Sequence, residues 1–347
     1  MDTKTSNTLQ TNNDTIPFED EYAVIGPDQN GMTSVFFCAF DTNITLQAYD
    51  EEELCRQAFA VARDECRRFE RLFSRMLPHS DISLLNNAKA RSVEVHLDTF
   101  QLLKAAKYYC EESLGVFDIT VGPVVRLWDF HNGMIPDKDR LRQELAHVNW
   151  RTLELYAVDN DDEDNNGEKD TEAARGTNLR FFARLTDPFA AVDLGGIAKG
   201  YIADSLSESL EAAGLKCFLI NLGGNVVVRG TKPNGALWRV GIQDPKDKNG
   251  ILGAIELTDV SVVTSGIYER CFERSGTLYH HILDLATGFP VETDAAGVTV
   301  VAKKSLDAEG YSTTLLASGI EKGRAFTKKH PEIHAYFVDH DGKISSV

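Results

Sequence analysis

Residues 192–201 read Val-Asp-Leu-Gly-Gly-Ile-Ala-Lys-Gly-Tyr, an apolar run followed by a glycine turn and the beginning of a helix-like stretch. Asp193 closes the apolar run, and Lys199 lies where helical spacing begins. Backbone amides that glycine leaves open, a helix N-terminus and a lysine together suit a phosphate group. A simpler interpretation is that Asp193 caps the helix and Lys199 lies on the surface. The stretch therefore predicts a turn and a helix that can bind phosphate.

A second stretch, residues 280–290, reads His-His-Ile-Leu-Asp-Leu-Ala-Thr-Gly-Phe-Pro. His281 and Asp284 stand three residues apart in a turn marked by glycine and proline, and such side chains serve acid–base and metal-ligand chemistry. Another glycine pair, in Asn221-Leu-Gly-Gly-Asn225, also ends an apolar run, which is typical of backbone that approaches a ligand closely. Together these stretches indicate a metal-assisted reaction on a phosphorylated ligand.

Two further carboxylates are candidates for the same site. Asp118 lies in an apolar segment between Gly115 and Pro123, where a carboxylate is costly unless it is hydrogen-bonded. It either accepts from a ligand or caps nearby backbone amides, and the local sequence does not separate the two. Glu309 and Thr313 share one face of the last predicted helix, where their oxygens can hold a hard cation. Acidic residues are also common in a helix's first turn, and the local pattern favours this simpler interpretation.

The charge of the chain narrows the classes of partner. The 347 residues carry a formal net charge of −17, which argues against binding to nucleic acid or to an anionic membrane. Residues 159–172 hold eight acids and one lysine, and we interpret the acidic segment, about 159–176, as a solvated loop. Residues 1–20 are polar, so we expect a disordered tail and no signal peptide. No apolar run reaches the length of about 18 residues that a membrane span needs. We therefore expect a cytoplasmic protein.

The rest of the chain, residues 21–347, shows strand-like and helix-like segments in clusters rather than in strict alternation. This order favours an α+β fold, with mixed sheets flanked by helices, over a doubly wound sheet. We find no internal repeat or linker and expect a single compact unit. Apolar spacing predicts helices at about 51–73 (capped by Asp50), 97–113, 197–213 and 307–320. Apolar or alternating runs predict strands at 34–40, 43–49, 151–158, 179–192, 217–228, 236–242, 252–257, 260–264, 278–284, 296–303 and 333–339.

From about residue 34 to residue 340 the chain resembles the ApbE-type FAD:protein FMN transferases, also called flavin transferases. The resemblance rests on motifs in a fixed order, found at residues 73–86, 117–123, 192–200, 221–225, 264–270 and 281–288. It implies an α+β, ApbE-like (T-fold-related) fold and a reaction that uses FAD and Mg²⁺. A serine or threonine hydroxyl of a target flavoprotein would attack the phosphorus on the riboflavin side of FAD. FMN would then be joined to the acceptor, and AMP would leave.

The same resemblance implies roles for individual residues. His281 would be the general base, because histidine suits deprotonation of an alcohol near neutral pH. The metal would be bound by Glu309, Thr313 and the backbone carbonyl of Ala198, with Asp284 as a further candidate. The residues expected to line the FAD site are Phe40, Met76, Val116, Phe117, Asp118, Asp193, Lys199 and Ile282.

Two departures from the family pattern affect this expectation. Glu309 stands where the family usually has aspartate, so Asp307 is an alternative metal ligand, and Leu285 stands where proline usually follows the aspartate. Two other functions stay open: a Mg²⁺-dependent FAD pyrophosphatase, which uses water as the nucleophile, and a flavin-binding protein without turnover. The presence of His281 and of the metal positions counts against the last of these.

Overall fold

The central element is a large antiparallel sheet. The computed structural model describes residues 22–159 and 179–347, so the predicted tail (1–20) and nearly all of the acidic loop (159–176) lie outside the described residues. Within those two ranges, nine strands form one sheet in the order β1-β2-β3-β7-β8-β11-β14-β15-β16. Their bounds are Ala23–Ile25, Thr33–Ala39, Thr42–Ala48, Phe218–Leu222, Asn225–Arg229, Val260–Gly266, Ala295–Ala302, Ile333–Asp339 and Ile344–Ser346.

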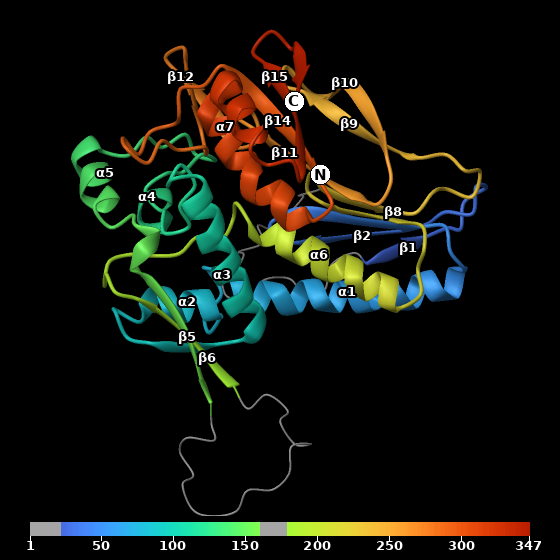
Figure 1. Ribbon diagram of the computed structural model, residues 1–347, viewed down its shortest axis with the longest axis horizontal. Helices are drawn as coiled ribbons and strands as arrows, with labels where there is room; N and C mark the ends of the chain where they lie inside the picture. Colours follow the sequence, from blue (N-terminus) through green and yellow to red (C-terminus); the bar gives the residue numbers. More distant parts are fainter. Residues whose placement is uncertain (1–21, 160–178) are drawn as a thin grey trace, which may run out of the picture.

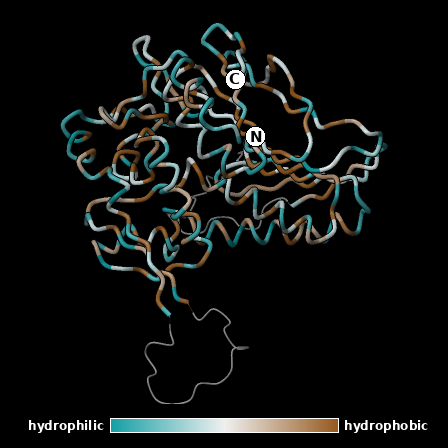
Figure 2. The backbone as a smooth tube through the Cα atoms, in the orientation of Figure 1, coloured by the Kyte–Doolittle hydropathy of each residue, from teal (hydrophilic) through white to brown (hydrophobic). Residues whose placement is uncertain are grey.

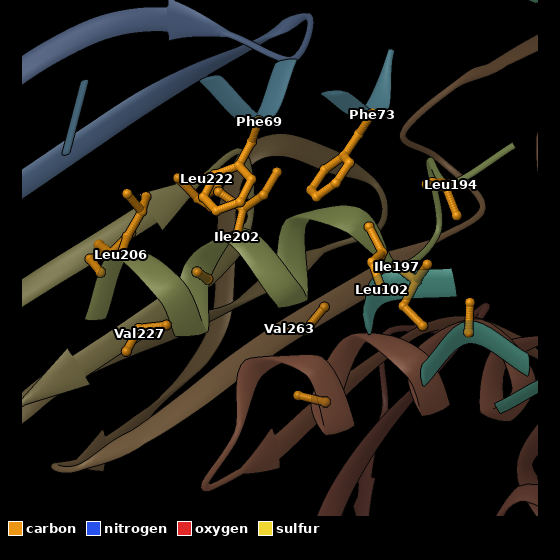
Figure 3. Close-up of a cluster of buried hydrophobic side chains, with 14 of the residues drawn as sticks. Phe69, Phe73, Leu102, Leu194, Ile197, Ile202, Leu206, Leu222, Val227 and Val263 are labelled. Carbon is orange, nitrogen blue, oxygen red and sulfur yellow. The ribbon is translucent and has the colours of Figure 1, made fainter. Parts of the chain in front are cut away.

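Three long helices pack against this sheet (Figure 1). Helix α1 (Glu52–Phe73) contacts β2, α6 (Ala198–Ala212) contacts β7 and β8, and α7 (Ser305–Thr327) contacts β11, β14 and β15. The helices also contact one another in the order α1–α6–α7. Figure 3 shows part of the main core between them, built from Phe69 and Phe73 of α1, Ile202 and Leu206 of α6, and Leu222, Val227 and Val263 of the sheet.

A second group of smaller elements surrounds α3 (Leu97–Glu112). It includes a three-stranded sheet in the order β4-β6-β5, a short helix before it and two short helices after α3. Two hairpins, β9–β10 and β12–β13, lie outside the large sheet. The bounds are α2 Asp81–Asn87, β4 Val93–Val95, α4 Gly122–Val125, α5 Lys138–Leu145, η1 Trp150–Thr152, β5 Leu153–Asp159, β6 Leu179–Leu185, β9 Trp238–Asp244, β10 Asp247–Leu257, β12 Cys271–Arg274 and β13 Thr277–His280.

Helix α1 forms because its apolar residues recur every three or four positions and give it one buried face. Figure 2 shows the matching change between hydrophobic and hydrophilic residues along this helix. The predicted cap was wrong by one residue: the Glu51 side chain accepts from the backbone N–H of Leu54 at 3.0 Å. Asp50 instead accepts from the backbone N–H groups of Lys216 and Cys217, which ties the start of α1 to the start of β7.

The α+β fold and the single compact unit are confirmed, and the long predicted elements are present within a few residues. Three boundaries were wrong. The strand predicted at 179–192 ends at Leu185, and the one predicted at 278–284 ends at His280, where the chain turns. Helix α7 continues to Thr327 across a kink at Gly319, whose φ of 76° is a left-handed conformation that favours glycine. Among the described residues, no helix is both long and apolar enough to span a bilayer.

Helices α6 and α7 approach closely at Gly200. A Cβ built there would lie 2.8 Å from the carbonyl oxygen of Ser305 and 2.9 Å from the Cα of Leu306. These are backbone atoms, which cannot move aside as a flexible side chain would. A glycine at this position therefore sets the distance between the two helices.

We expect Gly200→Ala to lower the free energy of unfolding by about 1–3 kcal/mol, because the new methyl group must push the two helices apart. Urea denaturation measures this loss. Gly253→Ala is the control, since a Cβ at Gly253 makes only an ordinary 3.5 Å contact with Ile344. Equal stability of the two variants would contradict the close approach of α6 and α7.

Asp204 of α6 caps the N-terminus of α7. Its carboxylate accepts from the backbone N–H groups of Ser305 and Leu306 at 2.7 and 2.9 Å. Burial nevertheless raises the pKa of this carboxyl from 3.8 to about 6. Between about pH 4 and pH 6, Asp204 therefore keeps its proton in the folded protein, whereas it has already lost the proton in the unfolded chain.

The contribution of Asp204 to stability is therefore expected to fall as the pH rises from about 4 to about 6, and to stay constant above that range. Asp204→Asn removes the titration but keeps an acceptor oxygen. We expect the free energy of unfolding of the wild type, relative to this variant, to decline between pH 4 and pH 6 in urea melts. A difference that is independent of pH, or that grows with pH, would contradict the raised pKa.

Candidate functional site

The predicted phosphate-binding turn leads directly into α6. Asp193 accepts from the backbone N–H of Gly195 at 2.8 Å, and its second oxygen pairs with the Arg75 guanidinium at 3.0 Å. The interpretation of Asp193 as a helix cap is therefore wrong: the cap residue of α6 is Ile197, whose side chain makes no capping hydrogen bond. The backbone N–H of Ala198, the first residue of α6, donates to the Leu194 carbonyl at 2.9 Å, so an anion would meet the N–H groups that follow it in the first turn.

Lys199 is not an ordinary surface lysine. Its ammonium contacts the Glu309 carboxylate of α7 at 2.7 Å, so the two predicted site residues form an ion pair across the α6–α7 interface. Glu309 is only 4% exposed, and its other oxygen accepts from the Asn225 side-chain amide at 2.9 Å. The start of α6 therefore packs against a buried carboxylate of α7 that is already paired with the Lys199 ammonium.

Thr313 lies on the same side of α7, one turn after Glu309. A Cβ built at Gly196 would lie 3.8 Å from the Thr313 hydroxyl and 3.1 Å from the Phe117 ring, so the glycine turn faces both. A Cβ at Gly200 would lie 3.0 Å from the Cβ of Glu309. The face of α7 that carries both predicted metal ligands thus packs on the beginning of α6, where the predicted carbonyl ligand Ala198 is the first residue.

His281 follows β13 and is largely buried. Its backbone N–H donates to the Arg270 carbonyl at 3.1 Å, which extends the β12–β13 pairing by one residue. Burial, together with the positive charges of Arg270 and Lys199, lowers the pKa of its imidazole to about 4. Its Nδ1 is buried and has no hydrogen-bond partner among the described residues. His281 is therefore a neutral imidazole near Lys199, which is the state that a general base needs.

Asp284 shapes the turn that follows His281. One of its carboxylate oxygens accepts from the backbone N–H of Ala286 at 2.9 Å, and the other accepts from the Thr287 hydroxyl at 3.2 Å. Asp284 also lines a cavity of about 510 Å³, together with Val116, Asp118, Ala317 of α7 and the segment around Trp150. The structure thus places Asp284 beside two predicted FAD residues, whereas Glu309 pairs with Lys199 on α6.

The local alternatives for Asp118 are resolved toward a structural role. Its carboxylate accepts from the backbone N–H and the hydroxyl of Thr120 at 2.7 and 2.6 Å, and from the backbone N–H of Trp150 at 3.0 Å. Burial raises its pKa, which these hydrogen bonds partly offset. Asp118 therefore holds the chain around Trp150 in place at the edge of the cavity.

The other residues predicted for the FAD site lie on several segments. Phe40 is at the β2–β3 turn, where its backbone N–H donates to Glu70. Met76 is 75% exposed and follows Arg75, the partner of Asp193. Ile282 is buried in the main core. The structure brings Phe117 next to the Gly196 turn.

The donor set can be compared with the needs of a metal ion. Among the described residues, no group of three or more His, Cys, Asp or Glu side chains is placed to hold a metal ion. The oxygens of Glu309, Thr313 and the Ala198 carbonyl are hard ligands, which Mg²⁺ prefers. Asp307 is engaged elsewhere, since it accepts from the Tyr109 hydroxyl at 2.6 Å. Glu309 already holds the Lys199 ammonium at the start of α6, one helical turn before Thr313, so its carboxylate is the better placed of the two for a cation.

Two residues of the site were not singled out in the sequence. Arg75 pairs with Asp193, and Asn225 donates to Glu309. Asn225 ends the second glycine pair, so its position gave a signal, but its partner is 84 residues away. Nothing in the local sequence could identify that pairing.

Comparison with known proteins identifies the family of the chain. The family model described as ApbE family matches residues 40–337. An FAD:protein FMN transferase of Klebsiella pneumoniae (strain 342) is 34% identical over 300 residues, 85% of this chain and 85% of the relative. One of Treponema pallidum (strain Nichols) is 34% identical over 273 residues, 74% of this chain and 70% of the relative.

Solved structures give the same answer for the fold. The crystal structure of the ApbE protein from Thermotoga maritima aligns with a TM-score of 0.75 at 25% identity, covering 94% of this chain and 96% of that one. A flavin transferase ApbE from Vibrio cholerae aligns with a TM-score of 0.75 at 22% identity. The family predicted from the ordered motifs is thereby confirmed: the chain belongs to the ApbE family.

Proposed function

We propose that the protein transfers FMN from FAD to a serine or threonine hydroxyl of a target flavoprotein, in a Mg²⁺-dependent reaction that releases AMP. The observation that carries the proposal is the grouping of Lys199, Glu309 and His281 at the start of α6. It is supported by relatives that are named FAD:protein FMN transferases and are matched over most of this chain.

The start of α6 is suited to the pyrophosphate of FAD. Its cap residue, Ile197, makes no side-chain capping bond, and the N–H groups that follow Ala198 in the first turn lie at the positive end of the helix dipole. Lys199, in the first turn, adds a full positive charge. In this proposal these groups bind the phosphates and hold the reacting phosphorus in place.

His281 supplies the proton acceptor. Its neutral imidazole takes the proton of the acceptor hydroxyl as the hydroxyl oxygen forms a bond to the phosphorus on the riboflavin side. The bond from that phosphorus to the oxygen shared with AMP breaks, and AMP leaves with the bonding electrons. FMN is left as a phosphoester of the acceptor residue.

Glu309, Thr313 and the Ala198 carbonyl would hold Mg²⁺, with Asp284 as a further candidate. When bound, Mg²⁺ neutralises negative charge on the transferred phosphoryl group, which is the main requirement of phosphoryl transfer. Lys199, which pairs with Glu309 at 2.7 Å, lies where it can contact the same phosphate.

Incubation of the protein with FAD and Mg²⁺, with and without a candidate flavoprotein acceptor, tests the proposal. Chromatography follows AMP, and fluorescence on a denaturing gel follows protein-bound flavin. We expect AMP only when the acceptor is present, in equal amount to the bound flavin. AMP and free FMN without acceptor would indicate a pyrophosphatase instead, and unchanged FAD would indicate a flavin-binding protein.

A further inference from the structure

Asn225, the first residue of β8, joins the second glycine turn to α7. Its side-chain amide donates to Glu309 Oε2 at 2.9 Å, and its own oxygen accepts from the Ser305 hydroxyl at 2.7 Å. Because the hydroxyl donates to the oxygen end of the amide, the nitrogen end must face Glu309. Asn225 and Ser305 are both almost completely buried, at 1% and 0% exposure, so water does not compete for these contacts.

The two oxygens of Glu309 therefore differ in how easily their partners can leave. Oε1 pairs with Lys199, whose side chain is 27% exposed and can turn toward solvent. Oε2 is held by Asn225, which the sheet and the Ser305 hydroxyl keep in place. A cation that replaces Lys199 would meet Oε1 in a fixed orientation while Oε2 stays hydrogen-bonded.

We propose that Asn225 is a positioning residue of the metal site. It holds the Glu309 carboxylate so that Oε1 can release Lys199 and bind a divalent cation in its place. Ser305 fixes the amide of Asn225 in the orientation that this requires. This inference rests on the metal role given to Glu309 in the proposed function. Residues that orient a metal ligand through a hydrogen bond typically contribute about 10–100-fold in metal affinity.

Titration of Mg²⁺ into the protein by calorimetry, without acceptor, tests the inference independently of turnover. Asn225→Ala is expected to weaken Mg²⁺ binding by about tenfold or more. In the transfer assay the same variant should need more Mg²⁺ but reach a near-normal kcat at saturation. Ser261→Ala is the matched control: it removes a buried hydrogen bond to Val226, the neighbour of Asn225, without touching Glu309. It should bind Mg²⁺ as the wild type does.

Ser305→Ala keeps the inference testable if Asn225→Ala does not fold. It should weaken Mg²⁺ binding in the same direction but less, because Asn225 retains its contact with Glu309. The double variant should bind Mg²⁺ no more weakly than Asn225→Ala alone, since Ser305 acts only through Asn225. If the losses of Mg²⁺ affinity in the two single variants add up in the double variant, Ser305 does not act through Asn225.

Wild-type Mg²⁺ affinity in both Asn225→Ala and Ser305→Ala would overturn the positioning role, while the proposed transfer of FMN would stand. A wild-type protein that takes up no Mg²⁺, either alone or with FAD, would overturn the metal role of Glu309 and the inference together. Equal weakening in the Ser261→Ala control would show a general effect of lost stability and would also contradict the inference.

Discussion

His281→Ala is expected to slow FMN transfer by a factor of about 10²–10⁴ while FAD binding is retained. The reason is the state of the imidazole: burial and the nearby charges of Arg270 and Lys199 lower its pKa to about 4, so it is neutral and can accept a proton at neutral pH. Without it, the acceptor hydroxyl must lose its proton to water. Single-turnover transfer measures the chemical step, and quenching of flavin fluorescence measures FAD binding.

The neighbouring His280 provides the control. It is also buried, and burial lowers its pKa to about 4 as well. Adjacent residues of an extended chain point to opposite sides, so only one of the two histidines can face the Lys199 side. His280→Ala should therefore keep most of the transfer activity. Full activity in His281→Ala would remove His281 from the mechanism.

The second large effect is expected for Glu309→Ala. The variant loses the carboxylate that we propose as a metal ligand, so the Mg²⁺ concentration for half-maximal transfer should rise by at least about tenfold. It should also lower the free energy of unfolding by about 1–3 kcal/mol, because the buried amide of Asn225 loses its acceptor. A Mg²⁺ titration of the transfer rate and a urea melt measure the two effects.

Two variants separate the metal role from the packing role. Glu309→Gln keeps an acceptor for Asn225 and should retain most of the stability while losing Mg²⁺ affinity. Asp307→Asn should leave the Mg²⁺ titration unchanged, because the Asp307 carboxylate already accepts from the Tyr109 hydroxyl. A normal titration in both Glu309 variants, or a shifted one in Asp307→Asn, would move the ligand role to Asp307 or Asp284.

The sequence predicted the elements whose pattern is long enough to show a period. Helix α1 has buried residues at every third or fourth position over 22 residues, and β2 alternates along its second half. By contrast, β4 has three residues and forms by pairing with β6, nearly ninety positions later. No period can appear in three residues, and the partner cannot be read from them. Other elements, such as α2 and β12, were missed for the same reason, because they are too short to show a period.

The candidate site shows a similar division. The turn with Asp193 and Lys199 was identified from local chemistry, because glycines, a helix start and a lysine are adjacent in the chain. For Glu309 the local pattern favoured an ordinary helix start, yet the residue is buried and pairs with Lys199, 110 positions away. For Asp118 the local sequence does not separate the two interpretations, and the structure shows its carboxylate accepting from Thr120 and Trp150. Tertiary contacts, which the local sequence does not show, decide which partners each carboxylate meets.

A crystal structure of the protein with FAD and Mg²⁺ would test the proposed site most directly. We predict that the pyrophosphate lies at the start of α6 in contact with Lys199, that Mg²⁺ is bound by Glu309 and Thr313, and that His281 faces the phosphorus on the riboflavin side. FAD bound elsewhere, for example in the groove of about 540 Å³ between α3 and β5, with Lys199 still paired to Glu309, would contradict it.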